Sequence, residues 1–254
     1  MDLNHPFVLA HYHLTTPDIR LRIKQIKFWV FASVKGAMIM GEKRIGKSYT
    51  IEFLLENIEK VVGQNCYAFS VLWKPQAHFN EKRFWTRLLS ATGFDTTLPG
   101  DADRLEARFY KRIQLAAETA GIPVCFLIID ESQNISAAEF VLLCHLFNEL
   151  EKRKIRLYTF LFGQDELEYT KTLMEDANHG QVIARFMQHS HRMRGVSSSR
   201  CLKSLLVQLD KQGFTADAVG KAVAEEYPLA DIATPLWNAK KAVCRNHAES
   251  ISKP

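Results

Sequence analysis

The chain has 254 residues, 47% of them hydrophobic, and its 33 basic and 28 acidic residues give a net charge of +5. This length allows one large α/β domain with a small appendage; no apolar run is long enough to cross a bilayer, and the first residues lack the pattern of a secretory signal. The five cysteines are scattered and never paired as CxxC, which argues against a disulfide framework or a zinc site and fits a reducing cytoplasm.

Hydrophobic periodicity, capping residues and turn signals predict helices that alternate with strands along the chain. A helix start at Thr16-Pro17-Asp18 precedes a basic amphipathic helix over residues 19–34, and a short apolar strand follows at 37–40. Further helices are predicted at 47–62, 81–91, 102–120 and 136–153 and from about residue 165, and further strands at 66–73, 124–130, 157–162 and 189–193. This alternation indicates an α/β fold with a central parallel sheet flanked by helices.

The turn at residues 195–199 predicts a domain boundary, because only helical pattern follows it. We therefore expect an N-terminal helical segment over residues 1–34, an α/β core over 35–195 and a small, short C-terminal helical lid over 196–254.

Basic side chains gather in two parts of the chain. Residues 177–209 contain no acidic residue, and a second basic run is formed by Arg20, Arg22, Lys24 and Lys27. Each stretch is interpreted either as a solvated helix face or as a surface that faces a polyanion.

A phosphate-binding loop is predicted between the strand at 37–40 and the helix at 47–62. The residues GEKRIGKS at 41–48 match G-x-x-x-x-G-K-[ST], whose glycines let backbone N–H groups converge on phosphate oxygens at a helix N-terminus. We expect Lys47 to reach the β- and γ-phosphates of ATP and Ser48 to ligate Mg²⁺; the alternative is a glycine turn with an incidental lysine. The predicted nucleotide-binding residues are Gly41, Glu42, Lys43, Arg44, Ile45, Gly46, Lys47, Ser48 and Tyr49.

An acidic strand end is predicted to complete this site. The apolar run VCFLIIDE at 124–131 is typical of a central parallel strand, and its carboxyl end lies where doubly wound sheets bind ligands. We expect Asp130 to hold the Mg²⁺ through water and Glu131 to polarise the attacking water.

Two later polar residues are candidates for catalysis, each with a plainer alternative. Gly163 and Gln164 follow the strand at 157–162, and Gln164 is predicted to orient the attacking water, or else is a loop-entry residue. Arg185 precedes the last predicted strand and is predicted to act as an arginine finger across a subunit interface, or else forms a surface salt bridge. The aromatic pair Phe84 and Trp85 is predicted to lie in the core rather than to stack on bases.

The segments MGEKRIGKS, AGIPVCFLIIDESQNI, LFGQDEL and VIARFMQHSHRMRGV resemble, in order and spacing, the AAA+ ATPases and within them the TniB/TnsC regulators of DNA transposition, which are related to IstB and MuB. The resemblance covers about residues 15–200. It implies a P-loop AAA+ core with the phosphate-loop strand near the centre of the sheet. It also implies ATP-dependent homo-oligomers, rings or helical filaments, that wind around double-stranded DNA and recruit a transposase on one face and a TniQ-like target-selection protein on another.

In that group, contacts to the DNA backbone come from the loop and helix start after the second strand and from the next loop. The matching positions here hold Lys82, Arg83, Thr96 and Thr97, although the two basic residues also fit a solvated helix start. AAA+ lids often direct an arginine to the nucleotide, whereas the matching stretch ADIATPLWNAKKAV at 230–243 contains none. We therefore expect slow ATP hydrolysis.

The resemblance predicts a cytoplasmic AAA+ ATPase that regulates DNA transposition, has no membrane partner, assembles on DNA when ATP binds and disassembles when ATP is hydrolysed. One alternative is an AAA+ ATPase of another process, such as an ExeA-like secretion ATPase or a defence system. ExeA-like chains normally add a membrane span and a wall-binding domain, which the sequence does not contain. Another alternative is a nucleotide-dependent scaffold with negligible turnover.

Overall fold

The computed structural model describes residues 14–94 and 100–211. The chain divides into two compact units: residues 22–193 form the larger one, and residues 1–21 with 194–254 form the smaller one. None of the described helices is long and apolar enough to cross a bilayer.

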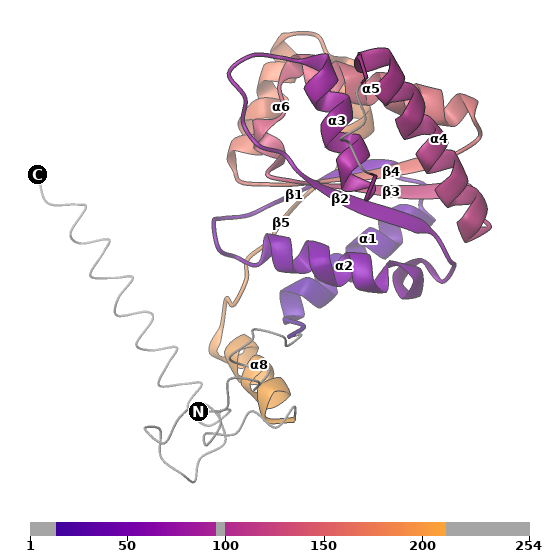
Figure 1. Cartoon of the computed structure of the whole chain (residues 1–254). Helices are drawn as coiled ribbons and strands as arrows, with labels where there is room; N and C mark the ends of the chain where they lie inside the picture. Colours follow the sequence, from indigo (N-terminus) through magenta and orange to yellow (C-terminus); the bar gives the residue numbers. More distant parts are fainter. Residues whose placement is uncertain (1–13, 95–99, 212–254) are drawn as a thin grey trace, which may run out of the picture. The chain divides into compact units, whose positions relative to one another are not determined.

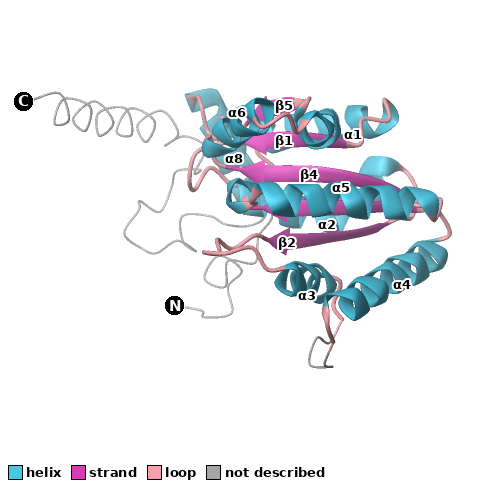
Figure 2. Ribbon diagram, turned by 90° about the horizontal axis from the view of Figure 1, so that it is seen from above, coloured by secondary structure: helices cyan, strands magenta, loops and turns pink. Residues whose placement is uncertain are grey.

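The larger unit is built on a parallel sheet with the strand order β2-β3-β4-β1-β5. The strands are β1 (Gly36–Met40), β2 (Tyr67–Leu72), β3 (Val124–Asp130), β4 (Arg156–Gly163) and β5 (Ser190–Arg192). Figure 2 shows the strands pointing in one direction, so all their carboxyl ends lie at one edge of the sheet. The predicted α/β fold is confirmed, and the phosphate-loop strand β1 lies beside the central strand β4.

Helices cover both faces of the sheet (Figure 1). One face carries α2 (Lys47–Val62) and the part of α1 (Pro17–Phe31) that belongs to the larger unit. The other face carries α3 (Glu81–Ala91), α4 (Ala102–Ala120), α5 (Ala137–Lys152) and α6 (Glu166–Asp176). The short helix α7 (Gly180–Val182) runs into a π-helical turn, η2 (Ile183–Met187), before β5.

The core has two layers because side chains of a strand alternate between the faces of a sheet. Leu127 and Ile129 of β3 pack toward α3, α4 and α5, whereas Phe126 and Ile128 pack toward α1 and α2. All side chains of β3 between its two ends are buried, as expected for a strand covered on both faces.

Aromatic residues fill much of the layer under α3 and α4. Phe84 and Trp85 are fully buried there, with their ring centroids 5.0 Å apart in an edge-to-face arrangement. Their predicted place in the core is confirmed.

The π-helical turn η2 was not predicted from the sequence, which indicates only a helix from about residue 165 and then the last strand. This turn packs so closely on β1 that a Cβ atom at Gly36 would lie 2.1 Å from the carbonyl oxygen of Arg185. The packing therefore requires glycine at the first residue of β1.

The smaller unit contains α8 (Ser199–Lys211) and the first described residues of the chain. The Asp18 carboxylate accepts hydrogen bonds from the backbone N–H groups of Arg194 and Gly195 at 3.0 and 3.2 Å, and the Gln208 amide bonds Thr15. Most of the predicted lid, including the arginine-free stretch at 230–243, lies outside the described residues.

Candidate functional site

The loop between β1 and α2 has the backbone shape of a phosphate cradle. Arg44 and Gly46 lie in the left-handed region, with φ of 60° and 101°. Gly46 is the N-cap of α2 and no side chain caps this helix end, so its first N–H groups are left to point at a ligand. A Cβ atom at Gly46 would meet nothing within 4 Å, so the glycine is needed for its φ rather than for space.

Lys47 lies inside this loop. Its side chain is buried, and its ammonium group donates hydrogen bonds to the carbonyl oxygens of Gly41 and Glu42 at 2.7 and 2.8 Å. These two bonds hold the positive charge of Lys47 inside the loop, where the predicted phosphates would bind.

Ser48 and Asp130 meet at the same edge of the sheet, one from the start of α2 and the other from the end of β3. The Ser48 hydroxyl donates to a carboxylate oxygen of Asp130 at 2.8 Å, and the other oxygen of Asp130 accepts the backbone N–H of Glu131 at 2.9 Å. A hydroxyl beside one carboxylate suits Mg²⁺, which takes few protein ligands together with water and substrate phosphates. The donor set therefore fits the predicted metal.

Glu131 follows with an unusual backbone. Its φ is 55°, a left-handed conformation that is uncommon for a residue with a side chain, and it begins the 3-10 turn η1 (Ser132–Asn134). Its carboxylate oxygen Oε2 accepts hydrogen bonds from the side-chain amides of Gln133 at 2.5 Å and Gln164 at 3.0 Å. The structure thus brings the side chains of Glu131 and Gln164 together.

Gln133 was missed by the sequence analysis. Besides its bond to Glu131, its amide oxygen accepts the backbone N–H of Gln164 at 3.0 Å, so it contacts both predicted catalytic residues. The only signal for it in the sequence is a polar residue two positions after Glu131, which is too weak to single it out.

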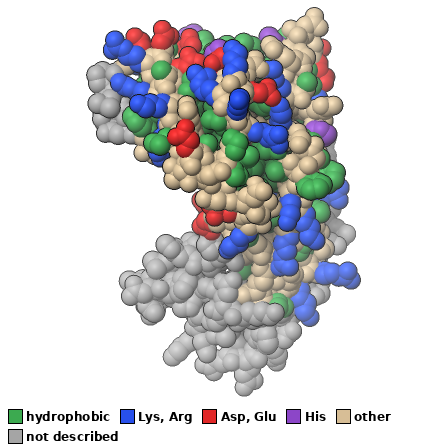
Figure 3. All heavy atoms as spheres, turned by 90° about the vertical axis from the view of Figure 1, so that its right-hand side faces the viewer, with side chains coloured by type: hydrophobic (Ala, Val, Ile, Leu, Met, Phe, Trp, Pro, Cys, Tyr) green, Lys and Arg blue, Asp and Glu red, His purple; other side chains and the backbone are tan. Residues whose placement is uncertain are grey.

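Arg185 lies at the other edge of the sheet, where the strands begin. Its guanidinium donates to the side-chain oxygen of Asn148 at 2.7 Å and lies 5.2 Å from the ring centre of Phe147. It lines a cavity of about 440 Å³ together with Lys35 and Glu151, which form a 2.7 Å ion pair. Figure 3 looks onto this edge and shows Lys and Arg side chains spread among hydrophobic ones.

The predicted DNA-contacting residues are only partly described. Lys82 and Arg83 are exposed in the first turn of α3, where the N-cap Asn80 accepts the backbone N–H of Arg83 at 2.8 Å. Thr96 and Thr97 lie outside the described residues.

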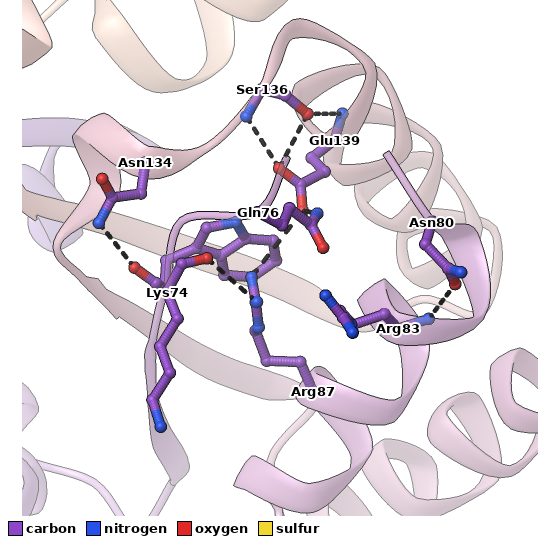
Figure 4. Close-up of polar contacts among 9 residues, drawn as sticks. Lys74, Gln76, Asn80, Arg83, Arg87, Asn134, Ser136 and Glu139 are labelled. Carbon is purple, nitrogen blue, oxygen red and sulfur yellow. Dashed lines mark hydrogen bonds and ion pairs between the residues drawn. The ribbon is translucent and has the colours of Figure 1, made fainter. Parts of the chain in front are cut away.

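Behind the loop before α3 is a buried carboxylate that was also missed (Figure 4). Glu139 is fully buried in the first turn of α5, forms a capping box with Ser136, and accepts a short hydrogen bond from the Gln76 amide. The Arg87 guanidinium lies 3.8 Å from Glu139 and 4.6 Å from the Trp73 ring centre. Burial lowers the pKa of Arg87, and the nearby Glu139 carboxylate opposes this shift.

A family model described as "AAA domain" matches residues 35–170, which hold the phosphate loop, the acidic strand end and Gln164. A search of curated proteins found no match.

Two solved structures illustrate the likeness of the fold. The Aeropyrum pernix ORC2 protein, in its ADPNP–ADP complexes, is 16% identical with a TM-score of 0.53 over 76% of this chain and 51% of that chain. A Walker-type ATPase of Pyrococcus abyssi is 13% identical with a TM-score of 0.50 over 91% of this chain and 75% of that chain. At these identities the likeness is one of fold, and the chain spans about half the length of the ORC2 chain.

Proposed function

The chain belongs to the AAA domain family, and from this membership together with the resemblance of its motifs to the TniB/TnsC regulators we propose that it is an ATP-dependent, DNA-binding ATPase that regulates DNA transposition. Family membership supports nucleotide hydrolysis in general. The observation that carries the proposal is the convergence of Lys47, the Ser48–Asp130 pair and the Glu131–Gln164 pair at one edge of the sheet.

ATP and Mg²⁺ would be held by the cradle between β1 and α2. The N–H groups of the loop and of the first turn of α2 would receive the phosphates, and Lys47 would exchange its bonds to Gly41 and Glu42 for terminal phosphate oxygens. Ser48 and Asp130 would hold the metal, directly or through water. When bound, the metal supplies charge that stabilises the phosphoryl group during transfer.

Glu131 is the proposed general base for the attacking water. Its carboxylate lies one residue beyond Asp130, and the amide of Gln164 contacts it at 3.0 Å. Gln164 would hold that water in line while the carboxylate takes its proton.

Arg185 is proposed to act on the nucleotide of a neighbouring subunit. It lies beside the first residue of β1, whereas the phosphate loop follows the last residue of that strand, about 13 Å along it at the usual rise per residue. Arg185 is therefore placed away from the cradle of its own chain, as an arginine finger that works in trans must be. This placement supports a homo-oligomer.

Duplex DNA is the proposed ligand of the loop before α3 and the start of α3. Lys74, Lys82 and Arg83 are exposed there, and such side chains bind phosphates without reading base sequence. Thr96 and Thr97 are proposed to add contacts from the next loop, and a transposase and a TniQ-like protein are the proposed protein partners.

The test is to measure phosphate release and particle size with ATP, with and without a 40-base-pair duplex of arbitrary sequence. We expect slow hydrolysis, assembly on the duplex and a steep loss of binding as salt rises. We expect Arg185→Ala to bind ATP without assembling or hydrolysing it efficiently. Wild-type protein that stays monomeric on the duplex would favour a secretion or defence ATPase, and assembly without phosphate release would favour a scaffold.

A further inference from the structure

The 3-10 turn η1 joins three strand ends through its three side chains. The buried Ser132 hydroxyl lies 2.8 Å from the carbonyl oxygen of Phe162 at the end of β4. The Gln133 amide reaches Glu131 and Gln164, and the Asn134 amide donates to the carbonyl oxygen of Trp73, just after β2, at 2.9 Å. Because the turn starts directly after Glu131, a shift of any of these strand ends would change the position of the turn next to the proposed general base.

Gln133 holds Glu131 in a defined orientation. Its amide oxygen accepts the backbone N–H of Gln164, so its NH₂ group must be the end that faces the Glu131 carboxylate, at 2.5 Å. Gly163 makes room for this arrangement, because a Cβ atom there would lie 2.9 Å from the Gln133 amide oxygen. A hydrogen bond to a charged carboxylate is among the stronger ones in proteins.

The loop before α3 is tied to the same stretch of chain at a second point. Asn134 bonds Trp73 at one place, and Glu139 bonds Gln76 at the other. Arg87 adds a hydrogen bond from its guanidinium to the carbonyl oxygen of Lys74 at 3.1 Å. Figure 4 shows these groups meeting between the loop and the start of α5.

The start of this loop is held by the core of the larger unit. Trp73 is fully buried, and its backbone N–H donates to the carbonyl oxygen of Asp130 at 2.9 Å. The loop therefore begins from a fixed point beside the proposed metal ligand. The exposed Lys74 follows directly, and Lys82 and Arg83 start the next helix. A polyanion bound to these cations would act on the backbone next to Trp73, whose carbonyl oxygen accepts the hydrogen bond from Asn134.

We infer that Gln133 is a positioning residue for Glu131, and that η1 couples DNA contacts at the loop before α3 to ATP hydrolysis through Asn134. The inference rests on the proposed function and adds a route for its regulation. Gln133 orients the Glu131 carboxylate, which takes the proton from water. Asn134 links the backbone at Trp73, where the loop begins, to η1, the turn that carries Gln133.

The positioning role is tested with Gln133→Met, which keeps the length of the side chain and removes both polar atoms. We expect kcat to fall about ten- to hundredfold while KM for ATP stays unchanged, as for a misplaced catalytic group. Unchanged kcat in Gln133→Met, or a KM for ATP that rises as much as kcat falls, would overturn the positioning role.

The coupling is tested with Asn134→Ala, measured as ATP turnover with and without the 40-base-pair duplex. We expect basal kcat to stay within about twofold of wild type, since the Gln133 contacts remain, and stimulation by the duplex to be lost. The matched control is Asn57→Ala, because the Asn57 amide also donates to a backbone carbonyl, that of Phe53 within α2, at 3.0 Å.

The outcomes separate this inference from the proposed function. Wild-type protein that hydrolyses no ATP would overturn the coupling together with the proposed ATPase activity, whereas wild-type protein that hydrolyses ATP without stimulation by the duplex would overturn the coupling alone. Wild-type protein that is stimulated, with Asn134→Ala stimulated equally, would overturn the coupling alone. Stimulation lost in Asn134→Ala and kept in Asn57→Ala supports it.

Discussion

Replacing Glu131 by glutamine should separate ATP binding from hydrolysis. The substitution keeps the shape of the side chain, and its amide oxygen can still accept the bonds that Gln133 and Gln164 now give to Oε2 at 2.5 and 3.0 Å. Only the negative charge that accepts a proton from water is lost. A positioned general base contributes about 10²- to 10⁴-fold, so kcat should fall by that factor, a rise of about 2.7–5.5 kcal/mol in the activation free energy.

The assay is phosphate release over a range of ATP concentrations, together with ATP affinity measured by direct binding. Affinity should change by less than about threefold, because Lys47, Ser48 and Asp130 are untouched. The control is Glu118→Gln, since the exposed Glu118 on α4 also accepts a bond from a glutamine amide, that of Gln114 at 3.2 Å. Hydrolysis by Glu131→Gln at the wild-type rate would refute the assignment of the base, and equal losses in both variants would refute its link to the site.

Three further predictions follow from the same geometry. Lys47→Ala should weaken ATP binding by about ten- to hundredfold in a direct binding assay, because it removes charge-assisted hydrogen bonds worth about 1.5–3 kcal/mol; unchanged affinity would exclude the cradle as the site. Replacing Lys82 and Arg83 together by alanine should reduce the slope of log affinity for duplex DNA against log salt by about two and leave ATP binding intact; an unchanged slope would place the DNA elsewhere. Gly36→Ala should lower the free energy of unfolding, measured in urea, by about 1–3 kcal/mol, because the new Cβ would lie 2.1 Å from a backbone oxygen. The control Gly180→Ala, whose Cβ would meet nothing within 4 Å, should change the free energy of unfolding by less than about 1 kcal/mol. Equal effects of the two substitutions would contradict the packing argument.

The sheet and the phosphate loop were predictable because their signals are local. Residues 124–130 form a short apolar run between two predicted helices. Such a run is typical of a strand that is covered on both faces. The glycine–lysine pattern at 41–48 is recognised from neighbouring residues alone, and in the structure Gly46 is left-handed at the start of α2. The order of the strands is not local, and it came only with the family resemblance.

Buried polar groups resisted prediction because their partners are distant in the sequence. Ser136 and Glu139 have the spacing of a capping box, which on its own indicates a helix start at the surface. Glu139 is nevertheless buried, and it meets Gln76 and Arg87, which come from another loop and another helix. A charge is tolerated there because several donors converge on it, and no single segment of the sequence contains them all.

The two glutamines that contact Glu131 differ in whether the sequence could single them out. Gln164 directly follows the buried strand β4, so the rule that ligands bind at the carboxyl ends of parallel strands was enough to select it. Gln133 lies beyond the end of β3, and it reaches Glu131 only because Glu131 adopts a φ of 55° and folds the chain back into η1. A side-chain-bearing residue seldom adopts this conformation, so neither propensity nor spacing predicts the bend. Such backbone conformations often occur at functional sites, where surrounding contacts hold them in place; here those contacts include the bonds of Ser132 to Phe162 and of Gln133 to Gln164, both at the end of β4.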